Sequence, residues 1–261
     1  MTIKYAKRAV FAFCVSALLL FSGCSKRETI TTLQQLDGKE FAIPTGTVAD
    51  KLVLQRLPNA KFKYFNSVMD AALAVKSGKA DAVVYDEPIL KNIAAKNSGL
   101  AVLTEMITHD HYGIAVQLQN QQLKEEIDGV LRELRANGSY DKMIERWFPK
   151  SGNPGPMPLI SFTGNNGVLR LGTATVTEPF SFVDGTRNPV GFDIELAGYI
   201  AKKLGKRLEI INMEFGSMIP ALISGKVEMI AACITITDER AKQVLFSESY
   251  YKGGIAALVN Q

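Results

Sequence analysis

Cysteine, histidine and tryptophan are scarce in this sequence, which has three, two and one of them among 261 residues. Cys14, Cys24 and Cys233 form no Cys-x-x-Cys or Cys/His spacing, and a lone Cys233 in the body of the chain predicts no intramolecular disulfide. The two histidines flank Asp110, a pattern more typical of an exposed loop than of a metal site. Phosphate-binding glycine loops, zinc signatures and Ser/His/Asp arrangements are also missing. We therefore expect neither a metal nor a cofactor.

The sequence also lacks a large net charge. The formal net charge is +4, and Lys4, Lys7 and Arg8 lie in the first 23 residues, which contain no acidic residue. Without that segment the charge is +4 minus 3, or +1. A near-neutral body offers no electrostatic footprint for a phosphate backbone, so we expect no nucleic acid as partner.

Long apolar runs are absent beyond the N-terminus. The run Ala9–Phe21 has 13 residues, too few for a membrane span of about 20. Because the basic stretch Lys4–Arg8 precedes it, this run predicts a signal peptide over residues 1–23. The segment Leu19–Cys24 resembles a bacterial lipobox, whose cysteine carries a lipid after cleavage; the alternative is a plain secretory signal with an incidental cysteine.

A lipid on Cys24 is expected to hold the mature protein at the periplasmic side of the cell envelope. Cys24→Ser should then move the protein from the membrane fraction into the soluble periplasm, because the lipid is the tether. Cell fractionation checks this, and equal distributions of the two proteins would contradict it.

The remaining sequence is ordinary globular composition, with 47% hydrophobic and 21% charged residues. Its length suits one large domain or two lobes of about a hundred residues each. Two segments repeat one order of signals: an N-capping serine, a helix, Ser-Gly-Lys and a buried strand. They run from Ser67 to Val84, with a helix expected over Val68–Lys76, and from Ser217 to Ala232, with a strand expected over Val227–Ala232. The repetition favours two similarly built lobes, and the alternation of helices with strands predicts an α/β fold with largely parallel sheets.

Further helices are predicted between these units. Apolar residues recur at helical spacing over Ile194–Leu204, with Asp193 as the expected N-cap, and over Leu123–Leu134. A shorter helix is expected over Tyr140–Trp147. Pro149–Gly167 is rich in proline and glycine without any period, which predicts a linker.

Motifs spread over most of the chain carry a family resemblance. In the C-terminal part they are Pro179–Phe182, Val190–Leu196, Phe215…Leu222, Ile234–Arg240 and Phe246…Tyr251. In the N-terminal part they are Leu36–Lys39, Thr45–Thr47, Asp81–Asp86, Tyr112–Val116, Leu134…Tyr140 and Trp147-Phe148. These segments resemble the polar amino-acid-binding proteins of ABC importers, the bacterial extracellular solute-binding proteins of family 3. The resemblance implies a two-lobed periplasmic-binding-protein fold of type II.

The order of the motifs departs from the family. Residues 30–110 resemble the second lobe, 111–148 the segment that returns to the first lobe, 149–167 form the linker, and 168–261 resemble the main part of the first lobe. We interpret the chain as a circular permutation, with residues 28–31 and 259–261 near each other at the hinge. The alternatives are a fragment of a tandem array and a domain-swapped dimer.

Two loops are expected to face each other across the cleft. In open α/β sheets ligands bind beyond the carboxyl ends of strands, where one loop carries Arg240 and the other begins Tyr85-Asp86. Arginine is a two-pronged donor for a carboxylate, and aspartate accepts hydrogen bonds from an ammonium group. The residues therefore predict a clamp for a free α-amino acid, and the resemblance implies the same roles.

Other binding residues are implied by the resemblance alone. Thr235 and the backbone amide of Thr47 would hold the ligand's carboxylate, the carbonyl of Cys233 would accept its ammonium, and Phe215 would pack on its aliphatic part. Relatives often place an acidic residue where Ala174 stands, an aromatic residue at Thr177, and a lysine or similar residue near Pro44. These departures leave the side chain of the ligand open.

The resemblance implies a binding protein without catalytic activity that delivers a free amino acid to a membrane permease. One alternative is a dehydratase on the same fold that acts on prephenate- or arogenate-like acids, with Glu178 or Glu87 as the candidate carboxylate. The other is a ligand-sensing module, which applies if the two parts do not close on each other.

Overall fold

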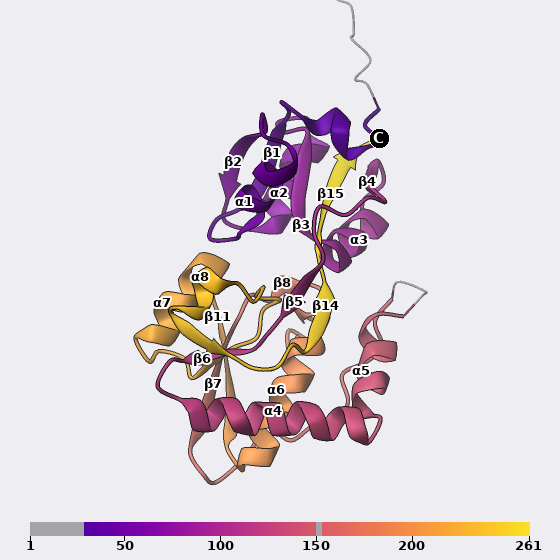
Figure 1. Ribbon diagram of the computed structural model, residues 1–261. Helices are drawn as coiled ribbons and strands as arrows, with labels where there is room; N and C mark the ends of the chain where they lie inside the picture. The colour runs from indigo at the N-terminus through magenta and orange to yellow at the C-terminus, as the bar shows by residue number, and fades with distance from the viewer. Residues whose placement is uncertain (1–28, 150–152) are drawn as a thin grey trace, which may run out of the picture.

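The computed structural model describes residues 29–149 and 153–261, which form two lobes joined by a two-stranded ribbon (Figure 1). The predicted signal peptide, residues 1–23, and the predicted lipidation site, Cys24, lie outside the described residues. Within the described ranges, no helix has the length and apolar character that a membrane crossing requires.

The N-terminal lobe is built on a five-stranded sheet of order β2-β1-β3-β15-β4. The first three strands pair in parallel, whereas β15 runs antiparallel to both β3 and β4. The strands are β1 (Glu40–Pro44), β2 (Lys61–Phe65), β3 (Ala82–Asp86), β4 (Leu100–Val102) and β15 (Ile255–Asn260), and the helices are η1 (Leu33–Leu36), α1 (Ala49–Arg56), α2 (Val68–Lys76) and α3 (Glu87–Lys96).

The C-terminal lobe contains a second five-stranded sheet, of order β11-β7-β12-β6-β13, and a small sheet of order β10-β9-β8. The strands are β6 (Ala115–Gln117), β7 (Val168–Thr173), β8 (Val176–Thr177), β9 (Ser181–Val183), β10 (Pro189–Val190), β11 (Arg207–Asn212), β12 (Met229–Ile230) and β13 (Val244–Phe246). The helices are α4 (Gln121–Ala136), α5 (Ser139–Trp147), α6 (Phe192–Leu204), η2 (Phe215–Ser217), α7 (Met218–Ile223) and α8 (Asp238–Ala241). Both lobes thus have the predicted α/β architecture.

The hinge is the antiparallel pair β5 (Asp110–Tyr112) and β14 (Tyr251–Gly253). Strand β15 continues from β14 into the N-terminal lobe. The predicted range 168–261 for the main part of the first lobe is therefore wrong at its end, because residues 255–260 belong to the N-terminal lobe. The two ends of the described chain do lie together, with Ile30 and Val259 in one buried cluster. They lie at the outer end of the N-terminal lobe, not at the predicted hinge position, because β15 carries the chain six residues away from the hinge (Figure 1).

Local signals explain most helix boundaries but not all. The hydroxyl of Ser67 accepts a hydrogen bond from the backbone N–H of Asp70 at 3.1 Å, so Ser67 caps α2 as predicted. Ser217 makes no such bond, because the turn η2 leads directly into α7 and gives Ser217 helical backbone angles. Asp193 is not the N-cap of α6, since Gly191 takes that place and Asp193 lies buried in the first turn.

The segment predicted as a linker joins α5 to β7 within the C-terminal lobe. Its described part has no regular secondary structure, yet it is fastened: the N–H of Leu208 donates to the carbonyl of Phe162 at 2.8 Å. The side chains of Ile160 and Phe162 lie against Gly198 on α6, where an added Cβ would meet them at 3.0 and 2.9 Å. The segment therefore packs against the lobe that it closes.

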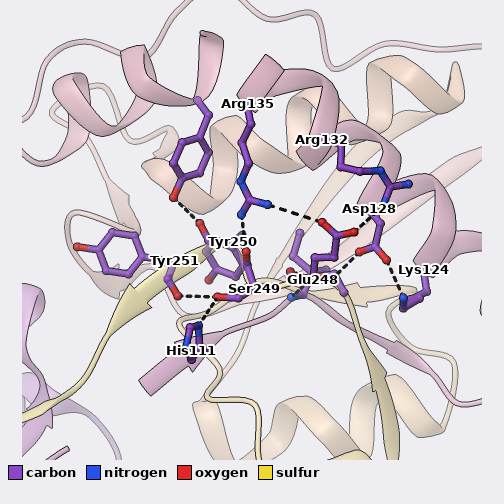
Figure 2. A network of polar contacts seen from close by, with 12 residues as sticks. His111, Lys124, Asp128, Arg132, Arg135, Glu248, Ser249, Tyr250 and Tyr251 are labelled. Carbon is purple, nitrogen blue, oxygen red and sulfur yellow. Dashed lines mark hydrogen bonds and ion pairs between the residues drawn. The ribbon is translucent and has the colours of Figure 1, made fainter. Parts of the chain in front are cut away.

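A polar network fixes the segment that leads into the hinge strand β14 (Figure 2). Arg132 of α4 pairs with Glu248, and Arg135 donates a hydrogen bond to the carbonyl of Ser249. The hydroxyl of Tyr140 on α5 donates to the carbonyl of Tyr250 at 2.6 Å. Because α4 and α5 hold three successive residues in this way, the backbone position of Tyr250 is set by the C-terminal lobe.

Candidate functional site

A cavity of about 440 Å³ opens between the two lobes. The N-terminal lobe contributes residues from β1, α2 and β3, and the C-terminal lobe contributes residues from its sheet edge and from η2. Its lining consists of Pro44, Asn66, Ser67, Val68, Asp70, Tyr85, Ala174, Val176, Thr177, Asn212, Met213, Glu214 and Phe215. Three of the predicted site residues, Tyr85, Ala174 and Phe215, therefore line one interlobe cavity.

Arg240 lies on α8 of the C-terminal lobe and is 6% exposed. Its side chain donates hydrogen bonds to the carbonyl of Thr235 at 3.0 Å and, across the interlobe boundary, to the carbonyl of Gly46 at 3.3 Å. The guanidinium carbon lies 5.4 Å from the centre of the Phe215 ring, within the range of a cation–π contact. Burial lowers the pKa of Arg240, and the nearby negative charge of Asp86 opposes that shift.

Asp86 ends β3 of the N-terminal lobe and is 5% exposed. One carboxylate oxygen accepts a short hydrogen bond from the hydroxyl of Tyr112 on the hinge strand β5. Burial raises the pKa of Asp86 to about 7, although the hydrogen bond from Tyr112 and the charge of Arg240 both act to lower it. The two charged groups attract each other from facing lobes without forming a direct ion pair.

The lobes touch each other around this site. A Cβ at Gly46 would lie 2.5 Å from the Cα of Gly216 of the other lobe, and the φ of Gly46 is +82°, so the approach requires glycine. The ion pairs Lys51–Glu239 and Lys96–Glu178 also join the lobes. These exposed pairs contribute about 0–1 kcal/mol each, so the buried groups dominate the contact.

The other predicted residues, which are Arg240, Asp86, Thr235, Thr47 and Cys233, are not among those that line the cavity. Thr235 is buried and joins the hinge strand through an isolated bridge to Tyr112. The hydroxyl of Thr47 donates to the carbonyl of Pro44 at 3.0 Å within a turn. Cys233 has a positive φ of 52°, and burial raises the pKa of its thiol well above the usual range, so the thiol stays uncharged. The structure groups these residues near Asp86 and Arg240, and their roles in binding stay predictions.

The sequence analysis missed the part that tyrosines play in the site. Tyr112 and Tyr250 are fully buried, and their hydroxyls contact Asp86 and the backbone N–H of Cys233, respectively. Both residues occur in the motifs that carried the resemblance. A sequence motif, however, does not identify the hydrogen-bond partner of a tyrosine hydroxyl. Asp193, taken for a helix cap, joins the same buried cluster.

Neither candidate carboxylate of the dehydratase alternative lines the cavity of about 440 Å³, but Glu87 lines a second cavity, of about 380 Å³, to which both lobes contribute residues. Glu87 pairs with Lys91 on α3, and Glu178 pairs with Lys96. Within residues 29–149 and 153–261, no three potential metal ligands of the His, Cys, Asp and Glu types gather at one place.

The chain folds into two α/β lobes, and Asp86 and Arg240 come from different lobes. The family model of the bacterial extracellular solute-binding proteins, family 3, matches residues 169–261 of this chain. The motif resemblance is thereby confirmed for the C-terminal part, and the permuted order relative to the family stays a prediction.

Similar proteins include ABC transporter arginine-binding protein 1 of Escherichia coli, 30% identical over 48% of this chain and 54% of that protein. The arginine-binding extracellular protein ArtP of Bacillus subtilis is 46% identical over 32% of each chain. Among solved structures, the arginine-bound domain 1 from TmArgBP is 40% identical, covers 36% of this chain and 81% of that one, and has a TM-score of 0.33. The chain thus spans about half of the first relative and about a third of the second.

Proposed function

We propose that this protein is the substrate-binding component of an ABC importer and encloses a free α-amino acid between its lobes. One observation carries the proposal: Arg240 and Asp86 are buried on facing lobes, carry opposite charges and make no direct pair with each other. A zwitterion offers a carboxylate to the first and an ammonium group to the second. Binding of both ends favours the closed arrangement, because only then are both buried charges matched.

The side chain of the ligand is proposed to be cationic. Asp70 and Glu214 line the cavity from opposite lobes, and within the described part of the chain neither has a cation as partner. Their negative charges favour a positive group between the lobes. Relatives named as arginine-, histidine- and lysine/arginine/ornithine-binding proteins support the same class of ligand. Ala174 is small and uncharged. The resemblance implies an acidic residue at this position in proteins that bind such ligands, so Ala174 itself contributes no negative charge.

Further parts of the proposal rest on the family. Relatives carry names of periplasmic or extracellular binding proteins, which supports an exported location and a permease as the partner. A lipid anchor at Cys24 remains part of the proposal from the sequence alone. We propose binding without catalysis, since the carboxylates of Glu87 and Glu178 are each paired with a lysine.

The order of the chain is proposed to be a circular permutation. Support comes from the family match, which begins only at residue 169, and from β15, which returns from the C-terminal segment to the N-terminal lobe. Under this proposal both halves of the clamp belong to one chain. A binding stoichiometry of one ligand per chain is therefore expected.

Isothermal titration calorimetry with L-arginine and three analogues tests the proposal. L-arginine should bind, whereas its amide and its Nα-acetyl derivative should bind far more weakly, because each leaves one buried charge of the clamp unmatched. L-citrulline, which has a similar shape without the charge, should bind more weakly than arginine. A thermal-shift screen of the twenty amino acids serves as the broader control.

Each outcome of this titration tests a different part of the proposed function. Capped analogues that bind as well as the parent would contradict the clamp. Citrulline that binds as well as arginine would contradict the cationic side chain and leave the amino-acid site standing. A response to none of the amino acids would overturn the proposed function.

A further inference from the structure

A buried carboxyl group belongs to the same cluster as Asp86 and Cys233, the proposed partners of the ammonium group. Asp193, in the first turn of α6, is 0% exposed, and neither of its carboxylate oxygens has a hydrogen-bond partner of ordinary geometry in the described chain. The nearest polar groups are the hydroxyl of Tyr250 and the backbone N–H of Cys233. A buried carboxylate so weakly compensated is costly, and protonation relieves that cost.

The surroundings of Asp193 are held in place by the C-terminal lobe. The hydroxyl of Tyr250 accepts the N–H of Cys233 at 3.1 Å, and the N–H of Tyr250 donates to the carbonyl of Tyr112 at 2.9 Å. The network around the carbonyl of Tyr250 fixes the same residue from the other side (Figure 2). Cys233 is held with positive φ, a conformation rare for a side chain with a β-carbon. Asp193 therefore cannot move easily toward solvent to be hydrated.

The charges around this carboxyl group are mostly negative. Burial, with a smaller contribution from the negative charge of Asp86, raises the pKa of Asp193 to about 8, although Tyr250 and Cys233 act to lower it. The groups that act on Asp86 itself are Tyr112, Asp110 and Arg240, and its pKa is about 7. A positive charge beside Asp86 would lower the pKa of both carboxyl groups.

We infer that Asp193 stores a proton while the cleft is empty and releases it when an ammonium group binds beside Asp86. The O–H bond of the carboxyl group breaks, the proton passes to the buffer, and no other covalent bond changes. The positive charge of the ligand then stabilises the buried carboxylates, as the proton did while the cleft was empty. Asp193 is thus a positioning residue that couples amino-acid binding to pH. This inference rests on the proposed function.

Calorimetric titration of the whole mature protein with L-arginine at pH 7, in buffers of low and high ionisation enthalpy, measures the protons released. The wild type should release protons on binding. Asp193→Asn should still bind arginine and release fewer protons, because the amide cannot ionise. Asp184→Asn is the matched control: Asp184 is half-buried, and hydrogen bonds from Thr186 and Asn188 lower its pKa, so it is already ionised at pH 7.

The pH dependence of affinity provides a second measurement that needs no variant. The affinity of the wild type should rise by up to tenfold per pH unit for each proton released, and the rise should continue to about pH 8, the pKa of Asp193. In Asp193→Asn the rise should level off near pH 7, where Asp86 is ionised.

Arginine binding without buffer dependence, or an affinity of the wild type that is flat above pH 7, would overturn the inference and leave the proposed function intact. If the wild type and Asp193→Asn release equal numbers of protons, the proton comes from another group, and this result would also overturn the inference. If arginine does not bind at all, the result would instead contradict the proposed function, on which the inference rests.

Discussion

We expect Arg240→Ala and Asp86→Ala each to weaken binding of an α-amino acid by roughly 30-fold to several thousand-fold, which corresponds to about 2–5 kcal/mol. The size of the effect follows from burial, since Arg240 and Asp86 are only 6% and 5% exposed. Removing one member of the clamp deprives one end of the ligand of its partner and leaves the other buried charge without its counterpart. Calorimetry with L-arginine measures the loss directly.

Matched controls separate the clamp from the general charge of the surface. Lys51→Ala removes an exposed cation that also bridges the lobes, and Asp184→Ala removes a half-buried carboxylate that does not line the interlobe cavity. Both should leave the affinity within about threefold, because exposed ion pairs contribute about 0–1 kcal/mol. Arg240→Lys keeps the charge but lacks the planar two-pronged donor, so it should recover only part of the affinity. Wild-type affinity in Arg240→Ala or Asp86→Ala would refute the clamp.

The unliganded protein is expected to lose stability as the pH rises from 5 to 8. Burial raises the folded-state pKa values of Asp86 and Asp193 to about 7 and about 8, from the ordinary value of 3.8 for an aspartate. Between these limits the folded protein binds more protons than the unfolded chain, so the free energy of unfolding falls with increasing pH. For Asp193 alone the fall between pH 5 and pH 8 amounts to about 4 kcal/mol.

Urea unfolding at pH 5, 7 and 8 measures this dependence. Asp193→Asn should flatten the curve and unfold at a higher urea concentration than the wild type at pH 8, because the amide carries no charge to bury. Asp86→Asn should act in the same direction over a slightly lower pH range. A free energy of unfolding that rises from pH 5 to pH 8 in the wild type would contradict the burial of these groups as weakly compensated acids.

Local elements of the fold were predictable because their signals lie within a few residues. The helix over Val68–Lys76 has both its boundaries and its serine cap as predicted, since the Ser67 hydroxyl needs only the nearby N–H of Asp70. The same signal at Ser217 was misleading, because the turn η2 precedes the helix and no sequence pattern distinguished the two cases. The predicted strand over Val227–Ala232 is confined to Met229–Ile230.

By itself, the sequence determined the α/β class, the division into similar units and the opposite charges of Arg240 and Asp86 at strand ends. Only the tertiary structure decided that β15 crosses into the N-terminal lobe, that the chain ends meet away from the hinge, and that Asp193 is buried beside Tyr250. The reason is physical: propensity, capping and periodicity act over a few residues along the chain. The burial and pairing of a carboxyl group depend on residues such as Tyr112 and Cys233, which are distant in the sequence and come together only when both lobes have folded.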